Sequence, residues 1–472
     1  MRKVVNTLFR SEKNAYRNID VIAHRGSSGD IPAHTIPAYE EAVKVGSDWI
    51  EFDVHSSKDG QLVLTHDIDL SLTTNVSELY PERKRKINAW CIDGELEEMC
   101  DWFVEDFDLE ELRSLHVSHQ SMTRRYRSNE SLEMWSKRGV AIDKNLFRIP
   151  TVKEAALAIQ NLRRSLKGLK KTSEFAAWEY PDHISNVIES KYQECNEHTS
   201  NTSTTTFPIV VDAAETAIRG SHEVDFNSGD RMVQRNLISG YERPIRRNVH
   251  GDRVFWTFEA DESPDVGLYI ETKRPSHYAS QNLHLEERLV EAIEQSGFDG
   301  PVIVQSFERG SLEILRSLKP EWGRVQLLIA RGCSQNDRDH VNIPPPESDT
   351  ESLERFLRDV ASYANGVGPH KSTIVSDPSN PPLSRSEFVE RAHAANLFVH
   401  PYTFRTDDLP NEYHGNAAFE FHQFFDLGVD GVFADFPAHG VFARQIYNDL
   451  QRRRRRQSQR DFFPNDEDPL WW

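Results

Sequence analysis

Ionisable residues follow short apolar segments at several points of this chain, and their types are those that bind phosphate esters and move protons. They are His24, Arg25, Glu51, Asp53, His66, Glu271 and Lys273. Each apolar segment is typical of a β-strand, along which side chains alternate, so we expect Glu51 and Asp53 to share one face, and likewise Glu271 and Lys273. Charged groups of this kind rarely lie unpaired in a core. The set therefore indicates a metal-assisted phosphoryl site.

The chemistry of these side chains narrows the kind of site further. Three carboxylates offer hard oxygen ligands, which suit one divalent cation, Ca²⁺ or Mg²⁺, better than zinc. Histidine titrates near neutral pH, so one histidine can accept a proton while the other donates one. A single histidine at a strand end is more often structural, and Lys273 could simply pair with Glu271. Two histidines beside three carboxylates favour a catalytic site.

Strand-like and helical runs alternate along the chain. We expect strands at 20–24, 48–54, 61–66, 267–271, 301–305, 324–330, 397–402 and 431–435, and helices at 36–45, 151–162, 282–296, 310–318, 350–364, 416–427 and 441–453. Repeated strand–helix units with apolar strands predict a parallel sheet with helices outside it. Roughly eight units predict a TIM (β/α)₈ barrel, in which the ionisable clusters fall at the carboxyl ends of the strands, where such barrels place active sites.

Two regions interrupt this alternation and are predicted to be long insertions between βα units of a barrel that occupies residues 15–450. The first, at about 75–148, is charged and carries two short helical patterns. The second, at about 167–262, is poorly periodic and includes a polar tract at 196–206, and it could instead be a small subdomain. Residues 451–472 form a basic and then acidic-aromatic tail.

The composition bounds the partners. The formal net charge of −19 would repel a polyanion, so we expect no nucleic-acid partner. No run of about 18 apolar residues predicts a membrane-spanning helix, and the basic start lacks the apolar run of a signal segment. The cysteines, Cys91, Cys100, Cys195 and Cys333, have no metal-binding spacing and read as free thiols. These features predict a cytoplasmic protein, and the arginine run at 452–456 leaves peripheral membrane contact open.

At these residues the chain resembles the glycerophosphodiester phosphodiesterase family, in the branch typified by bacterial periplasmic enzymes. The motifs that carry the resemblance occur in the family's order, at 22–26, 32–35, 46–54, 57–60, 66–67, 269–273, 305–307, 366–369, 400–405 and 431–437. The resemblance implies a metal-dependent phosphodiesterase on a TIM barrel. It does not explain the two insertions.

The resemblance also implies a reaction on a small-molecule phosphodiester. A glycerophosphodiester would be hydrolysed to an alcohol and sn-glycerol 3-phosphate, and the glycerol hydroxyl next to the phosphate would attack first, giving a cyclic phosphate that water opens. His24 matches the family's proton acceptor and His66 its proton donor. Beyond the motif roles, Tyr402 and Arg405 are candidates for lining the substrate pocket.

The remaining charged residues match groups that hold the cation and the phosphate. Glu51, Asp53 and Glu271 match the family's metal ligands, and Arg25 and Lys273 match its phosphate-binding groups. A divalent cation and Arg25 can neutralise charge on the phosphate in the transition state. The predicted cofactor is therefore one Ca²⁺ or Mg²⁺.

One position departs from the family pattern. Ala33 stands where the family usually has Glu, next to His34 and Thr35, which could merely cap the following helix. The loss of this carboxylate favours weak activity, an altered metal preference or a changed substrate. One alternative that follows is a pseudoenzyme that only binds a phosphodiester. A separate alternative is a lysophospholipase D-type enzyme acting on longer lipids, since the two insertions could enlarge or cover the pocket. Asp435, near the last strand, is expected to orient Arg25 or to cap a helix.

Overall fold

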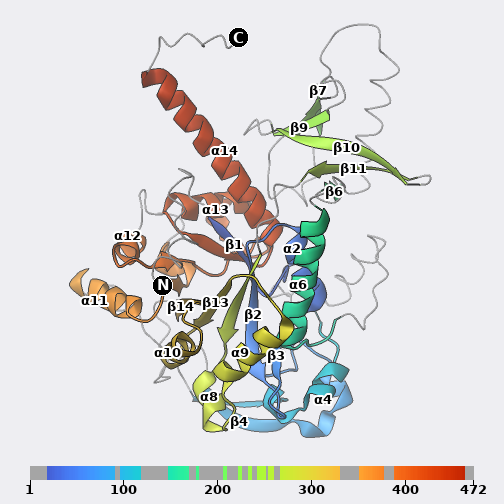
Figure 1. The fold of residues 1–472 in the computed structure, drawn as a ribbon, viewed down its shortest axis with the longest axis vertical. Helices are drawn as coiled ribbons and strands as arrows, with labels where there is room; N and C mark the ends of the chain where they lie inside the picture. Colours follow the sequence, from blue (N-terminus) through green and yellow to red (C-terminus); the bar gives the residue numbers. More distant parts are fainter. Residues whose placement is uncertain are drawn as a thin grey trace. The chain divides into compact units, whose positions relative to one another are not determined.

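The computed structural model describes residues 19–90, 96–118, 147–169, 266–329, 350–376 and 387–462, together with the strands between 177 and 259 (Figure 1). They belong to two compact units. The first comprises the described parts of 1–165, 264–415 and 423–441, and the second those of 166–263, 416–422 and 442–472. None of the described helices is both long and apolar enough to cross a membrane.

The first unit is built around a ring of parallel strands. In hydrogen-bonding order the strands are β16 (Phe398–Val399), β15 (Gly366–Pro369), β14 (Gly323–Leu328), β13 (Val302–Ser306), β12 (Gly267–Thr272), β2 (Trp49–Ser56), β1 (Asp20–Ala23) and β17 (Gly431–Ala434). Every neighbouring pair along this path is parallel.

Main-chain hydrogen bonds close the ring between β16 and β17. The Asp430 amide donates to the Val399 carbonyl at 2.9 Å, and the Phe433 amide donates to the Pro401 carbonyl at 3.1 Å. In return, the Phe404 amide donates to the Phe433 carbonyl at 2.8 Å. The TIM barrel predicted from the sequence is therefore confirmed.

The identity of one barrel strand differs from the prediction. The segment predicted as a strand at 61–66 is β3 (Leu62–Leu64), which runs antiparallel to β2 as a hairpin and lies off the ring. The barrel strand that was not predicted is β15, whose Gly-Val-Gly-Pro sequence is poor in strand-forming residues. Its first glycine is required by packing, because a Cβ at Gly366 would collide with the Phe398 ring on the neighbouring strand.

Helices follow most of the barrel strands. They are α2 (Ile36–Lys44), α6 (Val152–Leu169), α8 (Pro275–Ser280), α9 (Leu285–Ser296), α10 (Arg309–Leu318), α11 (Thr350–Ala361), α12 (Glu387–Ala394), α13 (Ala417–Asp426) and α14 (Pro437–Phe462). Helix α10 packs against β13 and β14, and α12 packs against β16. The predicted helices lie close to these bounds, whereas α8 and α12 were not predicted and α14 extends well beyond residue 453.

The first insertion packs around a small apolar cluster that it shares with residues flanking it in the chain. It contains α3 (Val76–Leu79), β4 (Arg85–Trp90), β5 (Leu96–Asp101) and α4 (Leu109–Ser114), with short 3₁₀ helices at Pro81–Arg83 and Val104–Asp106. Its buried residues pack with neighbours from the barrel; the cluster consists of Val63, Leu70, Val76, Trp102, Val104, Phe107, Leu112, Leu115 and Ile149. The two short helices agree with the sequence, and the antiparallel β4–β5 hairpin was not predicted.

The second unit contains an antiparallel sheet. Its strands are ordered β6 (Ala177–Glu179), β11 (Arg253–Glu259), β10 (Glu242–His250), β9 (Met232–Asn236), β8 (His222–Asp225) and β7 (Thr206–Ile209). The sequence of this region is too weakly alternating to have predicted these strands. Most of the polar tract at 196–206, residues 463–472 of the tail, Cys91, Cys195 and Cys333 lie outside the described residues. Cys100 is an exposed free thiol.

The interior of the barrel has an apolar layer whose positions set those of the polar residues. Its buried members are Ile22, Trp49, Tyr269, Ile303, Val325 and Phe433. Because side chains on one face of a strand recur every second residue, the next inward position lies two residues later. On five of these strands that position holds an ionisable or amide side chain: His24, Glu51, Glu271, Gln305 and Asp435.

Candidate active site

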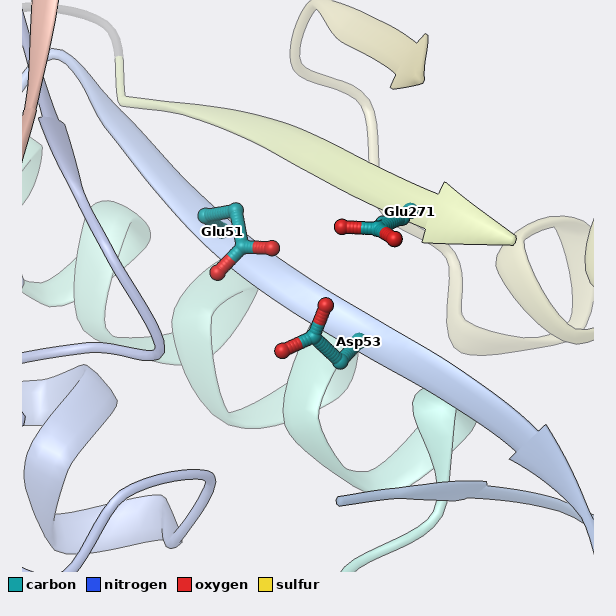
Figure 2. Close-up of side chains that lie close together, drawn as sticks. All are labelled: Glu51, Asp53 and Glu271. Carbon is teal, nitrogen blue, oxygen red and sulfur yellow. The ribbon is translucent and has the colours of Figure 1, made fainter. Parts of the chain in front are cut away.

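Three carboxylates meet above the apolar layer of the barrel. Glu51 and Asp53 come from β2 and Glu271 comes from β12, and the parallel register places Glu271 beside Asp53. Figure 2 shows the three side chains turned toward one another, and one oxygen atom from each lies within 4.8 Å of the others. All three are buried. Glu51 and Asp53 lie inside β2 rather than at its end, because β2 continues to Ser56 as the hairpin with β3.

The electrostatics of this carboxylate cluster favour a cation. Burial, the Asp53 charge and the Glu271 charge raise the pKa of Glu51 well above its usual range. Burial also raises the pKa of Glu271 to about 7, against the opposing attraction of Lys273. Burial acts on Asp53 in the same direction, but the Lys273 ammonium and a hydrogen bond from His34 hold the pKa of Asp53 well below its usual range.

The donor set fits a hard divalent ion. All three groups offer oxygen, and Asp53 Oδ1 is buried without a hydrogen bond, 3.2 Å from Lys273 Nζ. The amide oxygen of Gln305, whose Nε2 donates to Glu51 Oε1 at 3.3 Å, is also buried without a hydrogen bond. Oxygen ligands of this kind suit Ca²⁺ or Mg²⁺. A cation would relieve the mutual repulsion of the three carboxylates and bind the oxygen atoms that they turn toward one another.

The two predicted phosphate-binding cations border this cluster. Lys273 Nζ lies 2.8 Å from Glu271 Oε1, so the simple ion pair expected as an alternative is present. Arg25 Nε lies 3.3 Å from Asp53 Oδ2, and the Arg25 amide donates to Glu51 Oε2 at 2.8 Å. Arg25 adopts the left-handed backbone conformation, with φ 59°, which is uncommon for residues other than glycine and often occurs at functional sites.

His24 belongs to a hydrogen-bonded row of side chains, His24, Asp435 and Arg405, whose members come from the first and the last parts of the barrel sequence. Its Nδ1 lies 2.6 Å from Asp435 Oδ1, and Arg405 Nη1 donates to Asp435 Oδ2 at 2.6 Å. Asp435 therefore contacts His24, and our expectation that it orients Arg25 or caps a helix is replaced by this contact. Burial and the neighbouring Arg25 cation lower the pKa of His24, while Asp435 opposes the shift. The neutral ring that donates from Nδ1 leaves its Nε2 lone pair free to accept a proton.

His66 also has a carboxylate on its Nδ1. It follows β3, and its Nδ1 lies 2.6 Å from Asp67 Oδ1. Burial and the charges of Arg25 and Lys273 lower the pKa of His66 to about 3. The same ring contact, with burial opposing it, lowers the pKa of Asp67 to about 2. Asp67 was noted in the sequence only as part of a motif, and nothing in its spacing indicated that it binds the His66 ring.

His34 contacts the carboxylate cluster, which the sequence did not predict. Its Nε2 lies 2.9 Å from Asp53 Oδ2 and its Nδ1 lies 2.9 Å from the Tyr39 hydroxyl. Thr35, not His34, caps the helix, because its Oγ1 accepts from the Ala38 amide in the first turn of α2. His34 thus lies beside Asp53 and next to the position where Ala33 departs from the family pattern.

The two candidate pocket residues have different surroundings. Arg405 is joined to His24 through Asp435 and also donates to Asp407 at 2.8 Å. Tyr402 donates its hydroxyl to the Leu328 carbonyl at 2.9 Å, on the barrel wall. Arg405 is therefore linked to the candidate site, and a role of either residue in lining the pocket remains a prediction.

Comparisons with known proteins show the family of this chain. A model of the glycerophosphoryl diester phosphodiesterase family matches residues 24–188 and 233–439. A glycerophosphodiester phosphodiesterase of Arabidopsis thaliana is 24% identical over 439 residues, covering 88% of this chain and 83% of its own length. The glycerophosphodiester phosphodiesterase of Haemophilus influenzae is 23% identical over 456 residues, covering 93% and 91%.

Solved structures of the same kind align with most of the chain. A phosphodiesterase of Oleispira antarctica in complex with the product sn-glycerol-3-phosphate is 20% identical, with a TM-score of 0.44 and coverage of 90% of this chain and 96% of that one. A glycerophosphoryl diester phosphodiesterase structure from Silicibacter pomeroyi is 15% identical, with a TM-score of 0.48 and coverage of 91% and 94%. From the family match across most of its length, the chain belongs to the glycerophosphoryl diester phosphodiesterase family.

Proposed function

We propose that this protein hydrolyses glycerophosphodiesters to an alcohol and sn-glycerol 3-phosphate with the help of one divalent cation. The observation that carries the proposal is the convergence of Glu51, Asp53 and Glu271 on the inner face of the barrel. The family's named relatives are glycerophosphodiester phosphodiesterases. His24 and His66, each with a carboxylate on Nδ1, supply the proton transfers.

The three carboxylates would hold the cation, Ca²⁺ or Mg²⁺. When bound, the ion would supply positive charge to the phosphoryl oxygens and so favour the more highly charged transition state. Arg25 and Lys273 already neighbour Asp53. When the cation neutralises that carboxylate, we infer that both side chains become able to bind the phosphate. This set gives an anionic substrate a local positive site in a chain whose formal net charge is −19.

The proton transfers follow from the ring contacts. His24 Nε2 accepts the proton of the attacking hydroxyl, which forms the new bond to phosphorus. The bond from phosphorus to the departing oxygen breaks, and His66 Nε2 gives that oxygen a proton. When the attacker is the neighbouring glycerol hydroxyl, the product is a cyclic phosphate, and water opens it with the two histidines in exchanged roles.

The low pKa of His66 sets a condition on this scheme. Without substrate, burial and the charges of Arg25 and Lys273 lower the pKa of His66 to about 3, so its Nε2 is unprotonated at neutral pH. A bound phosphodiester brings a negative charge that offsets the two cations, and a nearby negative charge raises the pKa of a histidine. We infer that substrate binding promotes protonation of His66.

A hydrolysis assay tests the proposal. Glycerophosphocholine and lysophosphatidylcholine are each incubated with the purified protein, with and without chelator, and Ca²⁺ or Mg²⁺ is then returned separately. We expect choline release from glycerophosphocholine that stops in chelator and recovers with one of the two ions. Faster hydrolysis of lysophosphatidylcholine would indicate the lysophospholipase D-type alternative. Binding of either substrate without turnover under all conditions would indicate the pseudoenzyme that the Ala33 substitution suggests.

A further inference from the structure

A buried histidine outside the proposed mechanism holds the main chain at His66. His55 lies on β2, two residues after Asp53, and its side chain is buried. Its Nε2 lies 3.2 Å from the His66 carbonyl oxygen, and its Nδ1 lies 2.9 Å from the hydroxyl of Tyr278 on α8. A carbonyl oxygen can only accept, so His55 Nε2 carries the donated proton.

The contact between His55 and His66 lies just beyond the end of the β2–β3 ladder. The β2–β3 ladder ends with the pairing of Val54 and Leu64, so the chain leaves the sheet two residues before His66. The next main-chain bond, from the Thr65 amide to the Asp53 carbonyl, is 3.3 Å long. Beyond it, the His55 side chain supplies the hydrogen bond that the ladder no longer provides. His66 is thereby fixed at its carbonyl by His55 and at its ring by Asp67.

We propose that His55, held by Tyr278, is a positioning residue that aims the His66 ring at the departing oxygen of the substrate. The inference rests on the proposed function, in which His66 protonates that oxygen. A proton donor must lie within hydrogen-bond reach of the atom that it protonates. A misplacement of a catalytic group by about 1 Å can lower the rate about 100-fold. A shift of the loop that carries His66 would therefore slow catalysis even when the fold is intact.

The barrel offers a matched control for the loss of a buried histidine. His400 is also buried, and its Nδ1 lies 3.2 Å from the hydroxyl of a tyrosine, Tyr269. Among the described residues, His400 makes no hydrogen bond or ring contact with His66 or Asp67; its ring also packs against Phe398. His400→Leu and His55→Leu therefore remove the same group from two sites with similar polar partners, and only one of those sites touches the proposed acid.

The test compares two departing groups in single-turnover reactions. Choline release from glycerophosphocholine requires protonation of an alkoxide, whereas 4-nitrophenolate leaves glycerol 3-(4-nitrophenyl phosphate) without a proton, because nitrophenol is far more acidic than an alcohol. We expect His55→Leu to lower the rate with glycerophosphocholine by about 10- to 100-fold, with the enzyme concentration that gives the half-maximal rate unchanged, and to leave nitrophenolate release nearly unchanged. His55→Gln, whose amide can donate to the same carbonyl, should restore most of the lost rate.

The controls separate the inference from the proposed function. His66→Ala should show the largest gap between the two departing groups, and equal losses on both would refute the acid role itself. If His66→Ala shows the gap but His55→Leu lowers both rates equally, as His400→Leu is expected to do, the positioning role of His55 is overturned. Should His55→Leu fail to fold, Tyr278→Phe removes only the hydroxyl on the other ring nitrogen and must show a smaller gap of the same sign.

Discussion

Two layers of the barrel interior, separated by two residues on each strand, have opposite character. The lower layer is apolar and aromatic, and Tyr269 packs edge-to-face with Trp49 and Phe433 at centroid distances of 5.9 and 5.0 Å. The upper layer holds buried carboxylates, such as Glu51 and Glu271, that repel one another. A step of two residues moves a side chain by only about 7 Å along a strand, so the same strands build both layers.

The contrast indicates how the molecule separates stability from chemistry. Burial of aromatic surface in the lower layer stabilises the barrel, whereas buried like charges in the upper layer destabilise it until a cation arrives. The apolar lower layer also lowers the local dielectric constant and so strengthens the charge interactions in the upper layer. Substitutions in the two layers should therefore have different consequences, which four measurements test.

The largest expected effect concerns the upper-layer histidine and its counterpart in the β3 loop. His24→Ala and His66→Ala should each lower kcat by about 10²–10⁴-fold, the usual contribution of a general acid or base. Because both residues act in one reaction, the double variant should be little slower than either single variant. Circular dichroism should show unchanged folding. Turnover like that of the wild type in either single variant would remove that histidine from the mechanism.

The next prediction compares the stability effects of substitutions at two positions on β2, Trp49 and Glu51. Trp49→Ala should lower the free energy of unfolding by roughly 3–5 kcal/mol, because it empties a large site in the lower layer. Glu51→Gln, two residues later, should change it by less than about 1 kcal/mol in chelator, since the neutral amide resembles the protonated carboxyl that burial and its charged neighbours favour there. Urea unfolding of both variants in chelator measures this. A Glu51→Gln variant as unstable as Trp49→Ala would contradict the division of roles.

A smaller effect should appear in the pH dependence of stability. Burial lowers the pKa of His400, which lies against Tyr269, to about 4, below the ordinary value of 6.5. Between these two pH values the unfolded chain binds more protons than the folded chain, so the free energy of unfolding falls as the pH falls through this window. The contribution is roughly 2–3 kcal/mol by pH 4. His400→Leu should be less stable than the wild type at pH 7.5 and should lose less on acidification; parallel pH curves would refute the assignment.

The smallest effect is expected at Ala33. Restoring the family's carboxylate with Ala33→Glu should raise kcat/KM or metal affinity by a few-fold, since the position adjoins His34, which binds Asp53. In the described part of the chain, the cluster has no acidic member from the first insertion that would already fill this role. A clear loss of activity without unfolding would instead mean that the added charge repels the phosphate.

The alternation of apolar strands and helices was enough to predict the barrel, because strand period and helix period are local properties of the sequence. The same locality explains the errors. Gly366–Pro369 forms a strand only because its neighbours pair with it, and the segment at 61–66 was counted as a barrel strand because periodicity does not reveal antiparallel pairing. The strands of the second unit have too little alternation of apolar and polar residues to be predicted from the sequence.

In the site, the sequence identified the charged residues that lie in motifs but not their partners. His24 and Asp435 are 411 positions apart, and only closure of the barrel brings them to 2.6 Å. His34 and His55 have no distinguishing spacing, and their roles depend on loop conformation and on Tyr39 and Tyr278 beside them. Contacts of this kind follow from register and chain closure, which composition and periodicity do not determine.

The most direct test of the account is a titration of the metal-free protein with Mn²⁺, followed by electron paramagnetic resonance. The three carboxylates should bind one Mn²⁺ per chain, and Ca²⁺ or Mg²⁺ should displace it. Glu271→Gln should weaken this binding strongly while the fold stays intact. Absence of a Mn²⁺ site in the wild type, or equal affinity in Glu271→Gln, would contradict the claim that Glu51, Asp53 and Glu271 form a metal centre.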